Sequence, residues 1–591
     1  MTSTTANEIL QEAVKLHREG KLALAMDRYV KVLQGDPRNP DALYYVAVVA
    51  VQEGQFREGI RLAERALLLG SRPARIHNLI GQTHVRLDQP TQALASFGRA
   101  IDCEADFADA HSNRANLLAD LGRNAEALAG FDRALTLKPD LAQDWTNRGA
   151  VLDALGRASE ALASYDRPIE LAPGLAGAHF NRAGVLRDQG RLEEALAGFE
   201  RAIEINPNFA DAYANSGPAL RELGRIEEAI ERLDRAIAIE PKHVAALAGR
   251  GHCLREAGRL GAADADYSRA IELDPKHANA YLGRGLVRLT LSDWERGFRD
   301  YEYRASVGEP AYAPLPYPRW TGEITPGFRL LLLAEQGQGD TIQFARFAPL
   351  LAARGVHVTL LARPAMRQLL ASLDGAAIAT SLQEIAADPR PIRWLPLMSV
   401  PGIMRLTPAT VPADAPYLAA EPERIAAFAP RLPSGGLRIG INWNSGPSRE
   451  WYCRKRNIPL AAFAPLAALP GVRLVSLQDG AAASDLRLIG FPIEDLGDSL
   501  DADGAFIDRA AMMQNLDLVV TCDTSIAHLA GALARPVFTA LPFAADWHYG
   551  VDREDSPWYP TMRLFRQVRR GEWDEVFARI AEAVAGIPRA T

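Results

Sequence analysis

The chain has 591 residues, of which 48% are hydrophobic and 24% charged, and this composition excludes intrinsic disorder as a description of the whole. The net charge of −7 argues against a protein that coats nucleic acid. The four cysteines lie far apart without a CxxC pair, so neither a zinc site nor a disulfide framework is predicted. No signal peptide and no apolar run of about 18 residues occurs, which favours a cytoplasmic protein without a transmembrane segment.

The first half of the chain repeats with a period of 34 residues. Glycine, small, aromatic and proline residues each recur at this spacing. The glycine ends a first helix, the small residue lets two antiparallel helices approach, and the proline stops the second helix. The glycine position is occupied by Gly20, Gly54, Asp88, Gly122, Gly156, Gly190, Gly224, Gly258 and Ser292.

This helix-turn-helix pattern resembles the tetratricopeptide repeat over residues 6–305. The resemblance implies an all-α superhelical array whose first helices line a concave face. Pro168 stands where the repeat has Ala and is expected to kink a second helix. Eight full units begin at Ala6, Pro40, Ala74, Ala108, Ala142, Ala176, Ala210 and Val244, and a partial ninth begins near Ala278.

One position on the inner face is an asparagine in four successive units: Asn113, Asn147, Asn181 and Asn215. An amide both donates to and accepts from a peptide backbone, so these residues are candidates for binding an extended polypeptide. A similar asparagine ladder in the repeats of O-linked N-acetylglucosamine transferase holds polypeptide acceptors. The alternative is a solvated polar position that was inherited through duplication of the repeat.

The second half predicts a different architecture. A proline-rich connector at 306–320 is followed by a first Rossmann-like lobe at 321–433 and a second at 434–591. Strands alternate with helices, which predicts parallel sheets with helices on both faces. The expected strands are Arg329–Ala334, His357–Leu361, Ile392–Leu395, Leu437–Trp443, Val472–Leu477, Leu516–Thr521 and Pro536–Ala540. The expected helices lie near 341–353, 364–373, 421–429, 460–468, 505–514, 524–533 and 573–585.

Two loops at carboxyl ends of strands are candidates for the functional site. In the first, Gly337 and Gly339 would allow a sharp turn and a close approach to a ligand, and Asp340 is either a helix N-cap or a general base. In the second, the residues are Asp523, Thr524, Ser525 and His528. Helix-start amides near Ser525 would face a diphosphate, whereas Asp523 suits capping or ribose contact. His528 faces the same cleft, or positions the loop as a hydrogen-bonded, partly buried histidine.

The segment DLVVTCDTSIAHLAGALARP resembles the nucleotide-binding segment of the ADP-heptose lipopolysaccharide heptosyltransferase family. That family has Asp-Thr-Gly-x-x-His, and this chain departs from it at Ser525. The family's Gly-Asp after the first strand matches Gly339 and Asp340, which implies that Asp340 is the catalytic base. The resemblance implies a two-lobed GT-B fold and a nucleotide-sugar donor without a metal. A basic loop would neutralise the donor diphosphate through Arg454, Lys455 and Arg456, or is simply solvated.

Three further segments invite an interpretation. The aromatic and charged segment 546–567 is either a packed lid or a surface on which Trp547, Tyr549, Trp558 and Tyr559 stack with a sugar or base. Asp501 and Asp503 resemble a metal-binding Asp-x-Asp but are expected to be solvated. The final helix, 573–585, is expected to cross back to the first lobe.

The first hypothesis for the function is a glycosyltransferase that moves a sugar from a nucleotide-sugar to a polypeptide recruited by the repeats. The alternative is an interaction scaffold with a weak or inactive transferase-like domain. A third possibility is a lipid-linked or polysaccharide acceptor, with the repeats serving only to tether the enzyme.

Overall fold

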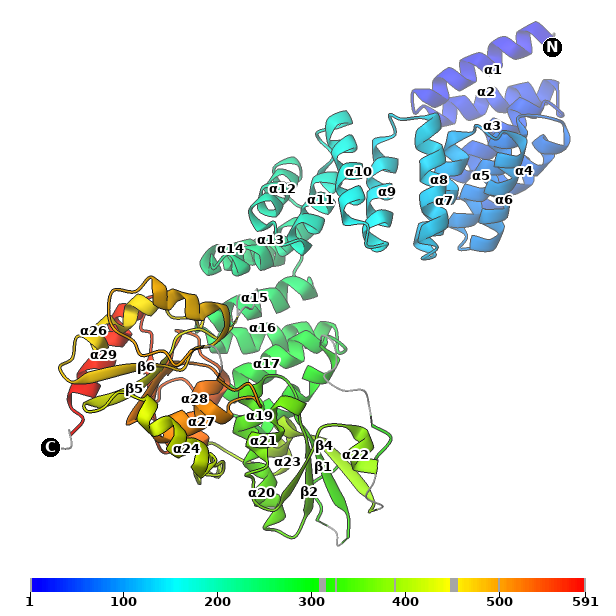
Figure 1. Cartoon of the computed structure of the whole chain (residues 1–591). Coiled ribbons are helices and arrows are strands. Elements are labelled where there is room, and N and C mark those ends of the chain that lie inside the picture. The colour runs from blue at the N-terminus through cyan, green and yellow to red at the C-terminus, as the bar shows by residue number, and fades with distance from the viewer. Residues whose placement is uncertain are drawn as a thin grey trace. The chain divides into compact units, whose positions relative to one another are not determined.

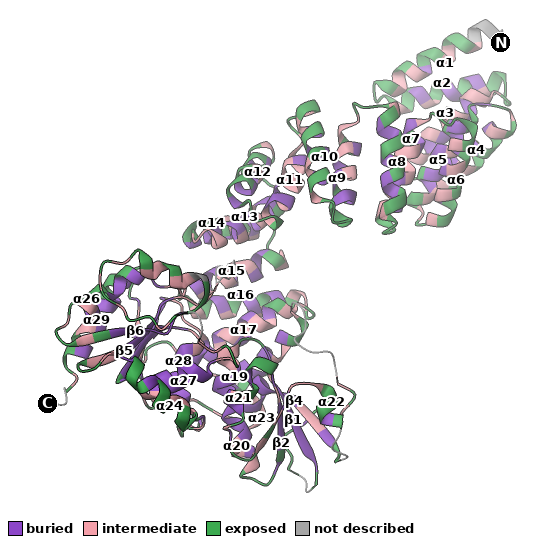
Figure 2. Cartoon of the chain, in the orientation of Figure 1, coloured by how far each residue is buried: buried purple, intermediate pink, exposed green. Residues whose placement is uncertain are grey.

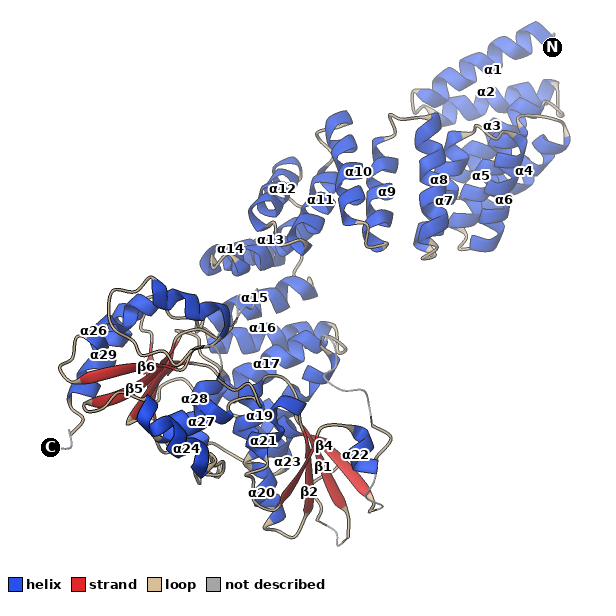
Figure 3. Cartoon of the chain, viewed as in Figure 1, coloured by secondary structure: helices blue, strands red, loops and turns tan. Residues whose placement is uncertain are grey.

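The computed structural model describes residues 3–307, 315–324, 327–386, 390–446, 455–497 and 500–588. The chain forms two compact units, Met1–Ala219 and Leu220–Thr591. The first is entirely helical, and the second combines helices with two sheets (Figure 3). Across the described ranges, no helix is both long and apolar enough to cross a membrane.

The first unit is built from antiparallel helix pairs, coloured blue to cyan in Figure 1. A first helix of each repeat begins at or within three residues of each predicted start, so the predicted repeat register is confirmed. The helices are α1 (Ser3–Arg18), α2 (Leu22–Gly35), α3 (Pro40–Gln52), α4 (Phe56–Leu68), α5 (Pro73–Arg86), α6 (Pro90–Cys103), α7 (Ala108–Asp120), α8 (Asn124–Leu137), α9 (Ala142–Ala154), α10 (Ala158–Leu171), α11 (Ala176–Asp188), α12 (Leu192–Ile205) and α13 (Ala210–Glu222).

The turn inside each pair explains the glycine register. Gly122 and Gly156 both have φ of +72°, in the left-handed region that glycine enters without steric cost. Asp88 and Ser292 adopt the same left-handed conformation, at φ of +56° and +66°. Aromatic residues of the predicted register, such as Phe131, are fully buried between the pairs. Pro168 lies within α10, which continues to Leu171.

The repeats continue into the second unit, because α13 runs through the boundary between the two. The ninth repeat has both of its helices, although the second is short. These helices are α14 (Ile226–Ile239), α15 (Val244–Glu256), α16 (Leu260–Leu273), α17 (Ala278–Thr290) and α18 (Trp294–Tyr301), followed by the 3-10 helix η1 (Glu302–Ser306). The compact units therefore differ from the predicted domains, whose boundaries stay a prediction.

The first sheet is parallel and has the order β3-β2-β1-β4. Its strands are β1 (Arg329–Leu333), β2 (His357–Leu361), β3 (Ala376–Ala379) and β4 (Ile392–Pro396). Because β2 and β4 lie on opposite sides of β1, the loop that leaves β1 sits where the strand order reverses. The helical segments between β1 and the second sheet are α19 (Gln338–Ala345), α20 (Phe347–Ala352), η2 (Pro364–Met366), α21 (Arg367–Leu370), α22 (Leu382–Ala386), η3 (Leu397–Ser399), α23 (Val400–Ile403), α24 (Pro422–Phe428) and η4 (Ala429–Arg431).

The second sheet is also parallel, with the order β6-β5-β7-β8-β9. Its strands are β5 (Leu437–Asn442), β6 (Val472–Ser476), β7 (Leu518–Cys522), β8 (Val537–Leu541) and β9 (Met562–Arg566). The strand order reverses between β5 and β7, so the loops after these two strands meet. Its helical segments are η5 (Leu460–Phe463), α26 (Ala464–Ala467), η6 (Gly480–Arg487), α27 (Ile507–Gln514), α28 (Ser525–Ala532), η7 (Trp547–Tyr549) and α29 (Trp573–Ala585).

All seven predicted strands are present, and the sequence analysis missed two others, β3 and β9. The sequence of β3 is AAIA, whose alanines give little apolar contrast. The sequence of β9, MRLFR, lies inside the aromatic and charged segment 546–567 and was interpreted as part of it. Central strands are buried on both faces, as the purple ribbons of Figure 2 show, and this explains their continuous apolar runs.

One apolar core joins the last repeat to both sheets. Trp294 and Phe298 of α18 pack against Trp547 and Trp558, and Phe344 of α19 contacts the same two tryptophans. Trp547, Tyr549, Trp558 and Tyr559 are all at most 3% exposed. The aromatic segment is therefore packed into the core. The four rings are too deeply buried to stack on a sugar or base. Their burial fastens the second lobe to the repeats.

Two other expectations are wrong. Helix α29 packs on its own lobe, where it contacts α26, η5, β8 and β9, because its apolar face completes the core under the second sheet. Asp501 is not solvated: its carboxylate accepts from the backbone N–H of Asp508, 2.7 Å away, and pairs with Arg509, which fixes the start of α27. Asp503 is exposed and pairs with Arg424.

Candidate functional site

The loops at both reversal points face one cavity of about 790 Å³ within the second unit. Helix α19 packs directly on α28, which brings the first-lobe loop against the second-lobe loop. Helices of the last repeats form the remaining wall. Eight predicted site residues line this cavity: Gly337, Gly339, Asp340, Arg456, Asp523, Thr524, Ser525 and His528.

The loop after β1 turns at a residue that the sequence analysis did not single out. Gln336 has φ of +59°, whereas Gly337 has φ of −80° and is the N-cap of α19. The expected role of the two glycines in a sharp turn is therefore wrong. Gly339 matters through proximity, because a Cβ there would lie 3.1 Å from Cδ2 of His528. Glycine at this position lets the two lobes approach each other.

Asp340 closes the first turn of α19 and also faces the cavity. It is the third helical residue rather than the N-cap, and its Oδ2 accepts from the backbone N–H of Gly337 at 3.0 Å. Burial raises the pKa of Asp340 to about 6, and the negative charges of Asp546 and Asp523 also raise it, whereas His548 lowers it. A carboxyl group with such a pKa can take a proton near neutral pH.

The loop after β7 is anchored by the end of β5. Thr524 is the N-cap of α28, and its hydroxyl donates to Oδ1 of Asn442 at 3.0 Å. Asn442 is buried and donates in turn to Oε1 of Gln478 at 2.9 Å. This network fixes the position from which the first amides of α28 point outward.

Asp523 is buried and does not cap the helix. The hydroxyl of Tyr549 donates to its Oδ1 at 2.9 Å, and Nη1 of Arg456 lies 3.6 Å from its Oδ2. His528 is also buried, and its Nδ1 lies 3.3 Å from the hydroxyl of Tyr559. Burial lowers the pKa of His528 to about 3, so the ring is neutral. The histidine both lines the cavity and is held by hydrogen bonding.

The three predicted basic residues do not share one place. Arg456 lines the large cavity, whereas Lys455 lines a smaller one and donates to the carbonyl of Ala544 at 3.0 Å. Burial lowers the pKa of Lys455 to about 8. Arg454 lies outside the described residues. A continuous basic loop facing one diphosphate is thus supported only at Arg456.

The repeats contribute groups that the sequence analysis did not assign to the site. Arg221 and Glu256 line the cavity and form an ion pair of 2.8 Å, with Glu256 only 2% exposed. His252 lines it as well and lies 2.8 Å from the hydroxyl of Tyr267, and burial lowers the pKa of this histidine to about 3. Gly283, 68 residues after Asn215 and therefore at the same repeat position, is also part of the wall.

Asp546 and His548 line the cavity too, and they lie in the aromatic and charged segment 546–567, where neither was predicted as a site residue. Nδ1 of His548 is 3.5 Å from Oδ1 of Asp546. Nε2 of His548 is buried without a hydrogen-bond partner among the described residues. The sequence signal that could have identified them was a histidine two residues after an aspartate, in a loop that follows a strand.

The four asparagines occupy equivalent places in first helices and are half-buried. Two of these amides also tie neighbouring helices together. Nδ2 of Asn113 donates to Oδ1 of Asn78 at 3.0 Å, and Nδ2 of Asn147 donates to Oδ1 of Asn116 at 2.7 Å. Part of the hydrogen-bonding capacity of the ladder is therefore used within the array, a role that neither sequence interpretation included.

Within the described ranges, no group of three or more His, Cys, Asp or Glu side chains is arranged to hold a metal ion. The charged groups that line the large cavity are mixed. The basic residues are Arg221, Arg255, Arg363 and Arg456, and the acidic residues are Glu256, Asp340, Asp523 and Asp546.

Comparison with known families covers most of the helical region. Family models of the tetratricopeptide repeat match residues 16–83, 78–142, 146–209, 186–252 and 251–291. Residues 16–142 and 146–291 are tetratricopeptide repeats. This confirms the resemblance inferred from the 34-residue period.

Among curated proteins, the chain is similar to Protein FlbA of Caulobacter vibrioides, with 27% identity over 324 residues. The match covers 50% of this chain and 53% of the relative, so the chain spans about half the length of that protein. Among solved structures, YrrB, described as a TPR protein with an unusual peptide-binding site, is 25% identical, with 32% of this chain and 97% of that chain covered and a TM-score of 0.28. The Cut9–Hcn1 complex is 16% identical, covers 47% of this chain and 55% of that chain, and has a TM-score of 0.36.

Proposed function

We propose that the protein is a glycosyltransferase that uses a nucleotide-sugar donor. The observation that carries this proposal is the single cavity that collects Asp340 from one parallel sheet and the start of α28 and Arg456 from the other. Ligands of parallel α/β sheets bind at such reversal points. A two-lobed GT-B arrangement, with the nucleotide on the second lobe, accounts for both loops.

In the proposed reaction, Asp340 accepts the proton of the acceptor hydroxyl as its oxygen attacks the anomeric carbon. The bond from that carbon to the diphosphate breaks, and the nucleoside diphosphate leaves with the electron pair. The first amides of α28 and the guanidinium of Arg456 face the developing negative charge. No metal is required for this stabilisation.

We further propose that the acceptor is a polypeptide delivered by the repeats. Residues of α13, α15 and α17 form part of the wall of the cavity that contains Asp340. The inner-face position of Asn113, Asn147, Asn181 and Asn215 continues through Gly249 to Gly283, and Gly283 lines that cavity. A polypeptide held by the four asparagines would thus be bound by the same chain that carries the proposed base.

Replacing Arg456 with Ala is expected to weaken the binding of nucleoside diphosphates about 10- to 100-fold, because a charged hydrogen bond to phosphate is lost. Isothermal titration of the full chain with UDP, GDP, ADP and CDP measures this. Arg553→Ala is the control, since Arg553 pairs with Asp555 and does not line the cavity. Equal affinity in the wild type and the Arg456 variant would contradict the assigned role of this arginine.

Changing Asn113, Asn147, Asn181 and Asn215 together to Ala is expected to lower sugar transfer to polypeptide about tenfold or more while nucleotide affinity stays the same. Incorporation of labelled sugar into precipitated protein from an extract of the source cells measures the transfer. The loss of inter-helix hydrogen bonds requires a check of helicity by circular dichroism. Asn124→Ala, on a second helix, is the control. Unchanged transfer by a folded variant would remove the ladder from the proposal.

The alternative function is an interaction scaffold, which the confirmed repeats favour by themselves. It predicts that the full, folded chain binds the four nucleotides only weakly or not at all in the titration. Micromolar binding of any one of them, lost in the Arg456 variant, would decide for the transferase.

A further inference from the structure

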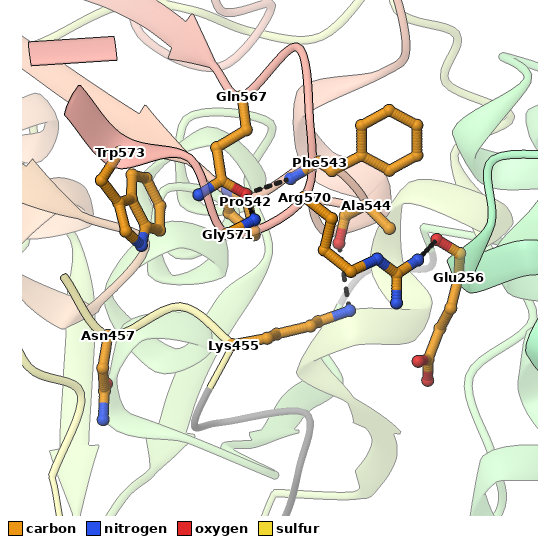
Figure 4. A pocket seen from close by; sticks show the side chains of 10 residues that line it. All are labelled: Glu256, Lys455, Asn457, Pro542, Phe543, Ala544, Gln567, Arg570, Gly571 and Trp573. Atoms are coloured by element: carbon orange, nitrogen blue, oxygen red, sulfur yellow. Dashed lines mark hydrogen bonds between the residues drawn. The ribbon is translucent and has the colours of Figure 1, made fainter. Parts of the chain in front are cut away.

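A second cavity, of about 230 Å³, lies where β8 and β9 end (Figure 4). It is smaller than the range of about 300–1,000 Å³ that is typical for drug-sized ligands, so it suits one planar group of the size of a nucleobase. Pro542, Phe543 and Ala544 form one wall, and Trp573 at the start of α29 contributes an indole. An apolar lining with few polar groups is the usual environment of a bound planar ring.

Gln567 is a polar residue of this cavity whose side chain is fixed by hydrogen bonds. Its side chain is buried, and its Oε1 accepts from the backbone N–H groups of Phe543 and Gly571, both at 3.2 Å. These two bonds determine which end of the amide is the oxygen. Nε2 is left buried without a partner among the described residues. A buried donor without a partner is costly, so a ligand that supplies an acceptor would be favoured.

The two cavities adjoin. Glu256 lines both, and the neighbouring residues Lys455 and Arg456 line one each. Oδ1 of Asn457, in the small cavity, accepts from the backbone N–H and the hydroxyl of Ser445, which lines the large one. A nucleotide with its diphosphate at α28 could therefore extend its base into the small cavity.

We propose that the small cavity holds the base of the donor nucleotide, and that Gln567 selects a base with a carbonyl oxygen on the edge opposite the sugar. This inference rests on the proposed function. In the view of Figure 4, Arg570 and Phe543 lie between Gln567 and Glu256, the residue shared with the large cavity. The edge that reaches Gln567 is thus the one remote from the ribose. On that edge uracil and guanine have a carbonyl, whereas cytosine and adenine have an amino group that cannot accept.

Equilibrium titration of the full chain tests the inference with two matched pairs of ligands, UDP against CDP and GDP against ADP. We expect the carbonyl-bearing member of a pair to bind about tenfold more tightly. In Gln567→Glu, one oxygen still accepts from the two backbone N–H groups, and the other replaces the donor. That variant is expected to reverse the preference within each pair, because it repels a carbonyl and accepts from an amino group. Gln383→Glu, at an exposed position in the first lobe, is expected to keep the wild-type ratio.

The ratio of two affinities does not depend on how much of a preparation is folded, and the wild-type ranking is informative even if the Gln567 variant fails to fold. Equal binding within both pairs, a preference for CDP and ADP, or a ratio unchanged by Gln567→Glu would overturn the inference and leave the proposed function standing. No binding of any nucleotide by the wild-type chain would instead remove the proposed function, and the inference with it.

Discussion

Asp340→Asn is expected to lower kcat/KM for sugar transfer about 100- to 10,000-fold, the usual contribution of a general base. An asparagine Oδ1 can still accept from the backbone N–H of Gly337, so the first turn of α19 is retained while the proton acceptor is lost. Nucleotide affinity, measured by titration, is expected to stay within about twofold of the wild type because no phosphate contact is removed. Asp555→Asn, at an exposed carboxylate paired with Arg553, is the control.

The pH dependence gives a second measurement of the same residue. Since burial raises the pKa of Asp340 to about 6, wild-type activity should fall as the pH drops through that value and the base becomes protonated. Stability changes in the opposite direction. Because the pKa is higher in the folded state, folding takes up a proton between about pH 4 and about pH 6. The buried carboxylate therefore does not destabilise the fold below its ordinary pKa of about 4, and its destabilising effect is complete above about pH 6. Asp340→Asn should therefore be at least as stable as the wild type at pH 7, and a less stable, partly unfolded variant would leave its low activity unexplained by base removal.

Glu335→Ala is expected to lower the free energy of unfolding of the second unit by about 3–5 kcal/mol. Arg304, at the end of the repeats, donates from Nη2 to Oε1 of Glu335 at 2.7 Å and from Nε to Oε2 at 3.1 Å. Both side chains are at most 5% exposed. Removing the carboxylate leaves the buried guanidinium with only the more exposed Glu302, 3.1 Å away, as a counter-ion, and it also removes the acceptor of the Met398 backbone N–H. Urea unfolding followed by tryptophan fluorescence measures the change.

Two comparison variants separate this buried pair from an ordinary one. Glu384→Ala breaks an exposed pair with Arg367 and is expected to lower the free energy of unfolding far less, because solvent screens this pair. Changing Arg304 and Glu335 together to Met should recover most of the stability, since apolar residues of similar size replace both charges. If Glu335→Ala were as stable as Glu384→Ala, the attachment of the repeats to the first lobe would not depend on this pair.

Much of the fold could be read from the sequence because its signals are local. The 34-residue period determined where each repeat helix begins, since glycine at the turn and a small residue at the helix contact are required within each pair. The buried parallel strands stood out as short apolar runs. Strand β3 did not stand out, because its alanines resemble those of a helix. Strand β9 lies inside the aromatic and charged segment 546–567 and was not separated from it.

The candidate site was predicted only in part. Asp340, Asp523 and His528 could be singled out because they follow strands at the edge where ligands of parallel sheets bind. Their local roles were not predictable: Asp340 caps from the third position of its helix, and Asp523 is held by Tyr549, 26 residues further along the chain. Contacts over such separations leave no periodic trace in a sequence.

By itself the sequence determined the helical repeats, the parallel α/β class of the second half, and the two loops that carry the candidate site, because each depends on neighbours along the chain. Only the tertiary structure decided that the last repeats share a core with both sheets and line the same cavity as Asp340. It also decided that Lys455 and Arg456 face different cavities and that Gln567 keeps a buried donor. The physical reason is that burial and pairing arise from segments that are distant in sequence, and packing alone brings them together.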